Sequence, residues 1–261
     1  MTTSTDAADL WKQWHEERIA TVAAPHGPLA LVGTHWLDDH PEGLLPAIPG
    51  HWRPDGDALV LTARAAEGFT VDGRPVDGET RLVADTTVTL GERRLVALVR
   101  EGLWAVRDFD PAAPTRAAFR GIDLNPHDPR WSVEGSFAPY EAAREVRVEN
   151  ADGKERGFGL AGELSFTFDG QEHTLKAARL GDGRLWAVFA DATGGDDTYR
   201  FRFLYAQAPD EQGRTTVDLN RAVLPNCAFS DHFLCPFPPP GNTLSFRVEA
   251  GEKNLTATGP G

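Results

Sequence analysis

The sequence predicts a mainly β protein with two antiparallel β regions, sandwich-like or barrel-like, and one amphipathic helix near the N-terminus. Short apolar or alternating segments recur from residue 29 to residue 250. Two-residue hairpin signals separate several of them, at Asp72-Gly73, Asp169-Gly170 and Asp182-Gly183. No long helical pattern alternates with these segments, so we expect antiparallel meanders and not βαβ units.

The composition is that of an ordinary globular chain, with 41% hydrophobic and 25% charged residues among 261. The 39 acidic and 26 basic residues give a net charge of −13, which disfavours nucleic acid and anionic membranes as partners. No segment approaches the roughly 20 apolar residues of a membrane span, and no apolar leader follows basic residues at the start. We therefore expect a soluble cytoplasmic protein with reduced thiols and leave its oligomeric state open.

A short polar tail and one helix are expected over residues 1–24. The pattern is helical from Asp6 to about Val22 and ends before Pro25 and Gly27. The side chains expected to share one helix face are those of Ala7, Leu10, Trp11 and Trp14. Two tryptophans on one stripe favour docking of the helix onto a sheet over binding of a ligand.

The first β region is expected over residues 25–125. Its strands are expected at Leu29–Leu37, Ala58–Ala63, Phe69–Val76, Thr86–Leu90, Leu95–Arg100 and Leu103–Arg107. The chain from Asp108 to about Tyr140 is rich in proline and is expected to connect the two β regions.

The second β region is expected over residues 126–261. Its strands are expected at Glu145–Val148, Glu163–Phe168, His173–Ala177, Arg184–Ala190, Tyr199–Ala206, Thr215–Leu219 and Thr243–Ala250. An aromatic face is expected from Tyr199, Phe201, Phe203 and Tyr205. Leu164, Phe166 and Phe168 should point to one side of their strand, with Ser165 and Thr167 on the other.

The candidate site begins where the segment Thr215–Asn220 meets a proline-rich loop. As a strand, this segment places Asp218 and Asn220 about 6.6 Å apart on its polar face, close enough to hold one small ligand. Arg221 follows where the strand leaves the sheet. The same residue types also commonly hydrogen-bond the backbone of such a loop, so the group has a structural interpretation too.

Cys227 and Cys235 lie eight positions apart around this loop. A nucleophilic Cys227 requires a lowered pKa, for which Arg221 or His232 is a possible source of charge. The spacing equally allows a disulfide or half of a metal site, and many free cysteines are only small buried hydrophobes. The sequence leaves these alternatives open.

Histidines gather in the first β region, at His26, His35, His40 and His51. Their spacings do not match those of metal ligands, so no metal site is expected. His35 ends an apolar segment and is expected to point into a cleft as a second candidate for a reactive group. Phosphate-loop, dinucleotide-binding and nucleophile-elbow motifs are missing, and any cofactor is unknown.

Several motifs occur together in the C-terminal part and in upstream blocks. The C-terminal motifs are Asp218-Leu-Asn-Arg-Ala222, Pro225-Asn-Cys-Ala-Phe229, Cys235-Pro-Phe-Pro-Pro-Pro-Gly-Asn242 and Gly251-Glu-Lys253. The upstream blocks are Leu31-Val-Gly-Thr-His-Trp-Leu37, Val106-Arg-Asp108 and Phe189-Ala-Asp-Ala-Thr193. In this order they resemble the domain of unknown function 1684 family, from about residue 10 to 253 and most specifically over 218–253. The resemblance implies a fold but no activity.

The chain also departs from the pattern of that family. Leu219 stands where members tend to carry an aromatic residue. Many members have a segment slightly similar to the phosphate-binding loop of a forkhead-associated domain, but here Asp38–Pro46 lacks the arginine and serine that phosphothreonine binding needs.

Three interpretations remain. The first is a small-molecule enzyme in which Asp218, Asn220 and Arg221 position the substrate, with Cys227 or His35 as the reactive group. The second is a non-catalytic β module that binds a small ligand or a peptide. In the third, the residues from 218 to 221 have a folding role and hold the proline-rich loop.

Overall fold

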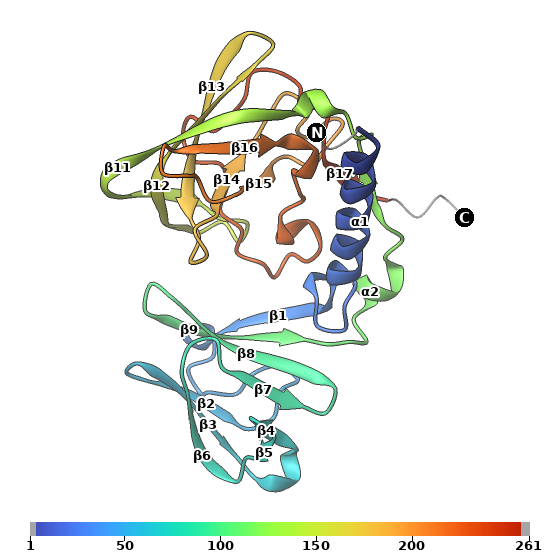
Figure 1. The fold of residues 1–261 in the computed structure, drawn as a ribbon. Coiled ribbons are helices and arrows are strands. Elements are labelled where there is room, and N and C mark those ends of the chain that lie inside the picture. Colours follow the sequence, from blue (N-terminus) through green and yellow to red (C-terminus); the bar gives the residue numbers. More distant parts are fainter. Residues whose placement is uncertain (1–3, 257–261) are drawn as a thin grey trace. The chain divides into compact units, whose positions relative to one another are not determined.

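The computed structural model describes residues 4–256, which form two compact units. The small unit contains Ala20–Phe119, and the large unit contains the described residues up to Ile19 and from Arg120 onwards. All sheets are antiparallel (Figure 1), which confirms the mainly β fold with an N-terminal helix. Residues 1–3 of the expected tail lie outside the described residues, and the division predicted at residues 24 and 125 stays a prediction.

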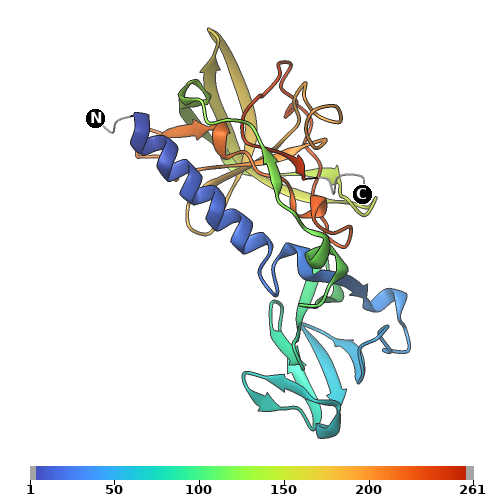
Figure 2. The same cartoon turned by 90° about the vertical axis from the view of Figure 1, so that its right-hand side faces the viewer.

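The N-terminal helix α1 (Ser4–Val22) is one continuous rod (Figure 2). Its expected apolar face is partly wrong, because Leu10 is 55% exposed whereas Trp11 is 8% exposed. The helix packs on the rest of the large unit through Trp11, which bonds the backbone O of Asn220 and lies against His127, and through Arg18, which pairs with Glu252. This face is held by polar anchors as well as by apolar burial, which a pattern of apolar residues does not reveal.

The small unit is built from two sheets around one core. Its strands are β1 (Leu31–Trp36), β2 (His51–Asp55), β3 (Ala58–Ala63), β4 (Phe69–Val71), β5 (Arg74–Pro75), β6 (Gly78–Leu82), β7 (Thr87–Leu90), β8 (Arg93–Arg100) and β9 (Leu103–Phe109). A six-stranded sheet has the order β1-β9-β8-β7-β4-β5, and a three-stranded sheet the order β2-β3-β6. A short helix, α2 (Pro114–Ala118), follows. Buried side chains of both sheets, among them Trp52, Leu61 and Val106, form the core.

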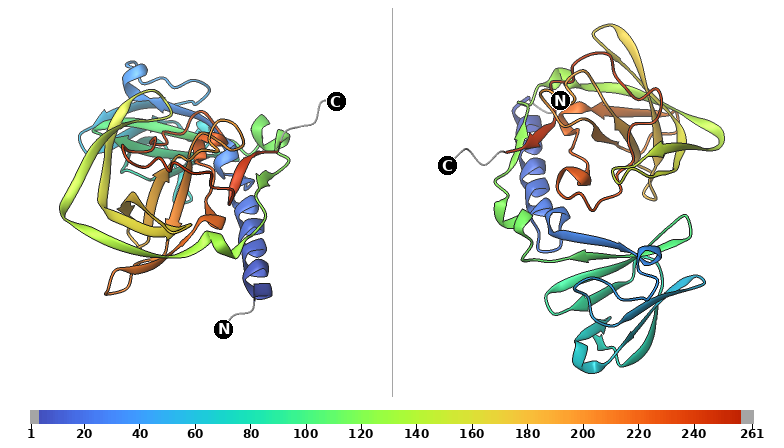
Figure 3. Two further views of the ribbon diagram at one scale, coloured as in Figure 1. Left: turned by 90° about the horizontal axis from the view of Figure 1, so that it is seen from above. Right: turned by 180° about the vertical axis from the view of Figure 1, so that it is seen from behind.

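The large unit contains a six-stranded half-barrel. The strands of the whole unit are β10 (Ile122–Leu124), β11 (Ser132–Glu149), β12 (Glu155–Phe168), β13 (Gln171–Arg179), β14 (Leu185–Phe189), β15 (Arg202–Ala206), β16 (Arg214–Asp218) and β17 (Glu252–Leu255). The sheet order is β15-β14-β13-β12-β11-β16, and β10 pairs with β17 separately. The long strands β11 and β12 curve strongly (Figure 3, left). Leu164, Phe166 and Phe168 point into the core, as predicted from their alternation.

Two sequence expectations for the large unit are wrong. The stretch Thr243–Ala250 is not a strand: it makes a single bridge, from Thr243 to Ala190, and its backbone is otherwise bonded by loops and side chains. The proline-rich interval is not only a connection, because β11 begins within it at Ser132. Pro139 is tolerated there because the register of β11 and β12 shifts between Pro139 and Arg144.

Among residues 4–256, no helix is long and apolar enough to cross a membrane.

Candidate functional site

The predicted polar group at the end of β16 lies in a tight turn and not on an open strand face. The strand ends at Asp218, one residue before the expected end, and a 3₁₀-helix (Leu219–Arg221) follows. Asp218 caps this helix, since its Oδ1 accepts hydrogen bonds from the backbone N of Asn220 at 3.2 Å and from its side-chain Nδ2 at 3.0 Å. Asp218 and Asn220 therefore bond to each other and do not face the same open space.

Asn220 is fully buried, and both ends of its amide are engaged. Its Oδ1 accepts from the backbone N of Asp128 at 3.0 Å, and its Nδ2 donates to the backbone O of Asp128 at 3.0 Å. The indole N–H of Trp11 donates to the backbone O of Asn220 at 2.9 Å. Asn220 thus joins helix α1 through its backbone O, and the chain before β11 to the end of β16 through its side-chain amide, which indicates a structural role.

Arg221 completes the 218–221 turn from the outside. Its Nε lies 3.4 Å from Asp218 Oδ2, and its guanidinium lies over the Trp14 ring, 5.4 Å from the centroid. Both side chains of this ion pair are partly exposed, so the pair adds little stability. The three predicted residues do come together, but in an arrangement that suits the folding interpretation better than the catalytic one.

Cys227 lies apart from that turn, next to the second cysteine. It is part of a short 3₁₀-helix (Asn226–Ala228), and both cysteines are free and 6% exposed. The backbone N of Cys227 donates to Cys235 Sγ at 3.2 Å, and the Tyr199 hydroxyl lies 3.6 Å from Cys227 Sγ. The expected activating groups Arg221 and His232 are not among the groups that perturb this thiol. Its polar neighbours are instead Tyr199 and Arg200, at the start of the aromatic segment 199–205.

The surroundings of Cys227 favour its thiolate. A hydrogen bond from Cys235 is the largest influence and lowers the pKa of Cys227, burial opposes it, and the Tyr199 hydroxyl and Arg200 lower it further. Burial and the neighbouring Cys227 raise the pKa of Tyr199 to about 12, so the phenol keeps its proton and can donate. The pKa of Cys235 is raised, first by its hydrogen bond to Cys227 and then by burial. The two thiols are therefore chemically unequal.

His35 belongs to the small unit, on β1, where it pairs in register with Val106. Its ring lies 6.1 Å from that of His40. The other four predicted site residues belong to the large unit, whereas His35 belongs to the small unit. No group of three or more His, Cys, Asp or Glu side chains within the described part of the chain is arranged to hold a metal ion.

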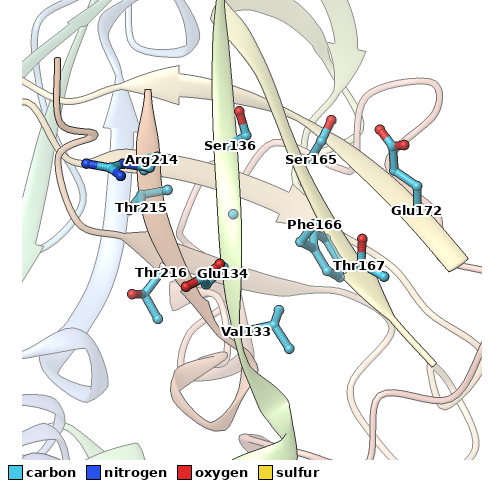
Figure 4. A pocket seen from close by; sticks show the side chains of 11 residues that line it. Val133, Glu134, Ser136, Ser165, Phe166, Thr167, Glu172, Arg214, Thr215 and Thr216 are labelled. Atoms are coloured by element: carbon cyan, nitrogen blue, oxygen red, sulfur yellow. The ribbon is translucent and has the colours of Figure 1, made fainter. Parts of the chain in front are cut away.

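The large unit has a groove of about 910 Å³ on the polar face of the half-barrel (Figure 4). Four adjacent strands, β16, β11, β12 and β13, supply its side chains. This polar groove is lined by the polar residues Glu134, Ser136, Ser165, Thr167, Glu172, Arg214, Thr215 and Thr216, and also by Val133, Gly135 and Phe166.

Strand register sets the positions of these polar side chains. Ser136 pairs with Arg214 on one side and with Ser165 on the other. In the next row, Glu134 pairs with Thr216, and Thr167 pairs with Glu172. Successive rows on one face are about 6.6 Å apart and neighbouring strands about 4.8 Å apart, so the groove presents a grid of polar groups.

No pattern in the sequence predicts the polar groove as a site. Ser165 and Thr167 alternate with apolar core residues, which indicates a strand, and Thr216 lies on the polar side of β16. Which polar faces become neighbours depends on the strand order β16-β11-β12-β13, which places Arg214 beside Ser136 although they are far apart in the sequence. No local motif encodes that order.

The fold and these sites define a mainly β protein in which a curved antiparallel sheet carries a polar groove and a buried pair of thiols. The chain belongs to the family described as "Protein of unknown function (DUF1684)", which matches residues 117–253, more than half of its length. This confirms the resemblance seen in the C-terminal motifs.

Several solved chains match this one, among them a chain that is similar in sequence. An uncharacterised protein from Haloarcula marismortui, studied in solution by NMR, is 32% identical, and the alignment covers 56% of this chain and 81% of that one with a TM-score of 0.45. No curated protein matches the chain.

Proposed function

We propose that the protein binds a small ligand carrying an ammonium group and several hydroxyl groups, of the amino-sugar class, in the polar groove of the large unit. The observation that carries this proposal is the pair of carboxylates of Glu134 and Glu172, both lining the groove. In the described residues neither carboxylate has a hydrogen bond or an ion pair. Both are therefore free to accept from a ligand.

The charge of the groove supports a cationic ligand. Arg214 also lines it, but Asp210 Oδ2 accepts from Arg214 Nε at 2.8 Å and offsets its charge. The two remaining carboxylates are on strands two positions apart in the sheet, on the order of 10 Å from each other. A cation between them is attracted by both, and hydroxyl groups of the ligand can bond the serine and threonine side chains, which donate and accept.

A polar sheet face alone does not indicate a binding site, because the outer face of an antiparallel sheet is commonly polar. The concave shape and the two unpaired acids distinguish this face. The enzyme interpretation has less support, because the Asn220 amide is bonded to Asp128 and Asp218 Oδ1 is bonded to Asn220. The binding interpretation leaves those groups in their structural positions.

The proposal includes neither nucleic acid nor membrane as a partner, because a net charge of −13 repels phosphate groups. It also includes a cytoplasmic location, where thiols stay reduced. Cell fractionation tests the location: recovery with the cytoplasmic fraction supports it, and recovery with membranes or in the medium contradicts it.

Calorimetric titration of the full chain with glucosamine, glucose and glucuronate tests the ligand class. We expect glucosamine to bind best and glucuronate worst, with the preference for glucosamine weakening at high salt because the attraction is electrostatic. Glu134→Gln and Glu172→Gln should each weaken glucosamine binding about tenfold, since hydrogen bonds to charged groups contribute about 1.5–3 kcal/mol.

The matched control is Glu141→Gln, on the same strand as Glu134 but outside the groove. It should leave the affinity unchanged. The proposal fails if none of the three sugars binds, if glucuronate binds best, or if Glu141→Gln weakens binding as much as the groove variants do.

A further inference from the structure

The loop between the 218–221 turn and β17 contains both cysteines of the chain, and the structure brings their side chains together. The 3.2 Å hydrogen bond from the Cys227 backbone N fixes the position of Cys235 Sγ. Because an N–Cα bond is about 1.46 Å long, this sulfur lies within about 5 Å of Cys227 Cα. Cys235 is also the largest influence on the pKa of the Cys227 thiol, in agreement with this proximity. At this separation a disulfide can form by rotation of the side chains.

The backbone on both sides of the pair is anchored. The backbone O of Cys235 accepts from Ala151 N at 2.9 Å, and Asn150 Nδ2 donates to the backbone O of Leu234 at 3.1 Å. At the other cysteine, the backbone N of Ala228 donates to the O of Pro225 at 2.9 Å. The two cysteines are thus held next to each other by bonds that do not involve the sulfurs.

Tyr199 and Arg200 distinguish the two sulfurs. The Tyr199 hydroxyl contacts Cys227 Sγ, and Arg200 adds positive charge near the same sulfur. The thiolate is the form of cysteine that attacks an oxidant, and donors and cations around it increase its population. Cys227 is therefore the sulfur expected to react first, and Cys235 the one expected to resolve the product.

We propose that Cys227 and Cys235 form a redox pair that hydroperoxides convert into an intramolecular disulfide. In the first step the Cys227 thiolate attacks one oxygen of the hydroperoxide, and the O–O bond breaks. Cys227 becomes a sulfenic acid, and the second oxygen leaves as water or an alcohol after taking up a proton. In the second step the Cys235 sulfur attacks the Cys227 sulfur, the S–O bond breaks, and water leaves with the proton of Cys235. Two electrons pass from the two sulfurs to the peroxide.

The disulfide closes a loop of nine positions, 227–235, and restrains the segment whose first residue contacts the Tyr199 hydroxyl. Closure of a short loop limits the unfolded chain, so the oxidised protein should melt at a higher temperature than the reduced one. A dithiol reductant should restore the lower melting temperature. This site is independent of the polar groove, and either proposal can fail alone.

Intact-mass spectrometry of the reduced full chain after exposure to hydrogen peroxide tests the pair. We expect a loss of about 2 Da, loss of both titratable thiols, and no covalent dimer on a non-reducing gel. With Cys235→Ser, a sulfenic acid should accumulate at residue 227 and be trapped by dimedone. With Cys227→Ser, no trapping at Cys235 should be seen.

Tyr199→Phe keeps the ring and removes the hydroxyl, so it should slow the oxidation several-fold. Circular dichroism shows whether each variant is folded. If the serine variants do not fold, the proposal is still tested by the mass of the oxidised wild type and by the oxidation rate of the Tyr199→Phe variant. The proposal is wrong if peroxide leaves both thiols free in the folded protein but not in urea. It is also wrong if the disulfide joins two chains, or if dimedone labels Cys235 first.

Discussion

The side chain of Asn220 hydrogen-bonds the backbone of Asp128 in both directions, across 92 positions of the sequence. One amide thereby replaces two backbone partners that Asp128 would have in a strand. Asn220 is fully buried and both bonds are partly buried, so water replaces them only in part when the amide is removed.

Asn220→Ala should therefore destabilise the large unit by about 2–3 kcal/mol, because the partly buried N–H and C=O of Asp128 both lose their partner. Urea unfolding followed by circular dichroism measures the loss. Asn254→Ala is the matched control, since Asn254 Nδ2 makes one hydrogen bond, to the O of Asp197 at 3.1 Å, and its loss should cost about 1 kcal/mol. Equal costs for the two variants would argue against the structural role of the 218–221 turn.

Gly251 carries a second prediction. Its φ is +73°, and a Cβ added there would lie 2.5 Å from the backbone O of Ala222. Gly153 has a φ of +75° but open space around the added Cβ. Gly153→Ala should cost about 1–2 kcal/mol for the left-handed backbone alone, and Gly251→Ala should cost clearly more because the backbone must also shift. Thermal or urea unfolding of both variants gives the difference, and similar losses would contradict the close approach.

A buried ion pair predicts a pH dependence. Arg202 is fully buried, and its Nη2 donates to Asp191 Oδ2 at 2.7 Å and to the backbone O of Val248 at 2.9 Å. Burial by itself raises the pKa of Asp191, but Arg202 and the hydrogen bonds from Thr193 outweigh it, so this pKa lies below its ordinary value. A lowered carboxyl pKa stabilises the folded state above the unfolded value of about 3.9, and this stability is lost as the pH falls through the folded value.

Unfolding free energies measured from pH 6 to pH 2 should thus fall more steeply for the wild type than for Asp191→Asn. At neutral pH the Asp191→Asn variant should itself be less stable by about 3–5 kcal/mol, because the charge of Arg202 stays buried without its partner. The double variant Asp191→Leu with Arg202→Met should regain part of this loss. Asp231→Asn, at an exposed position, serves as the control and should follow the wild-type profile. Parallel profiles of wild type and Asp191→Asn would rule out this carboxyl as the source of acid sensitivity.

Local sequence signals predicted much of the secondary structure. Asp72-Gly73 and Asp169-Gly170 both have positive φ at both positions, as two-residue hairpin turns require, and each joins two paired strands. These signals act within a few residues of the chain. They need no knowledge of the rest of the fold, so they can be identified from the sequence.

The wrong assignments share a physical cause in long-range bonding. Thr243–Ala250 has an alternating pattern, but the buried Arg202 donates to the backbone O of Val248 and of Ala250, which removes these groups from strand pairing. The end of β16 likewise departs from a strand because Asn220 bonds Asp128 instead of a neighbouring strand. A pattern of apolar residues contains no information on such partners.

The amino-acid sequence by itself determined the β class, the hairpins, the core side of β12 and membership of a family, because each depends on neighbouring residues or on motifs. The tertiary structure decided which polar groups are already bonded and which are free: Asn220 is bonded by distant backbone, whereas Glu134 and Glu172 line an open groove. The physical reason is that the availability of a donor or acceptor depends on its partners in space. Those partners are brought by strand order and loop packing, not by adjacency in the chain.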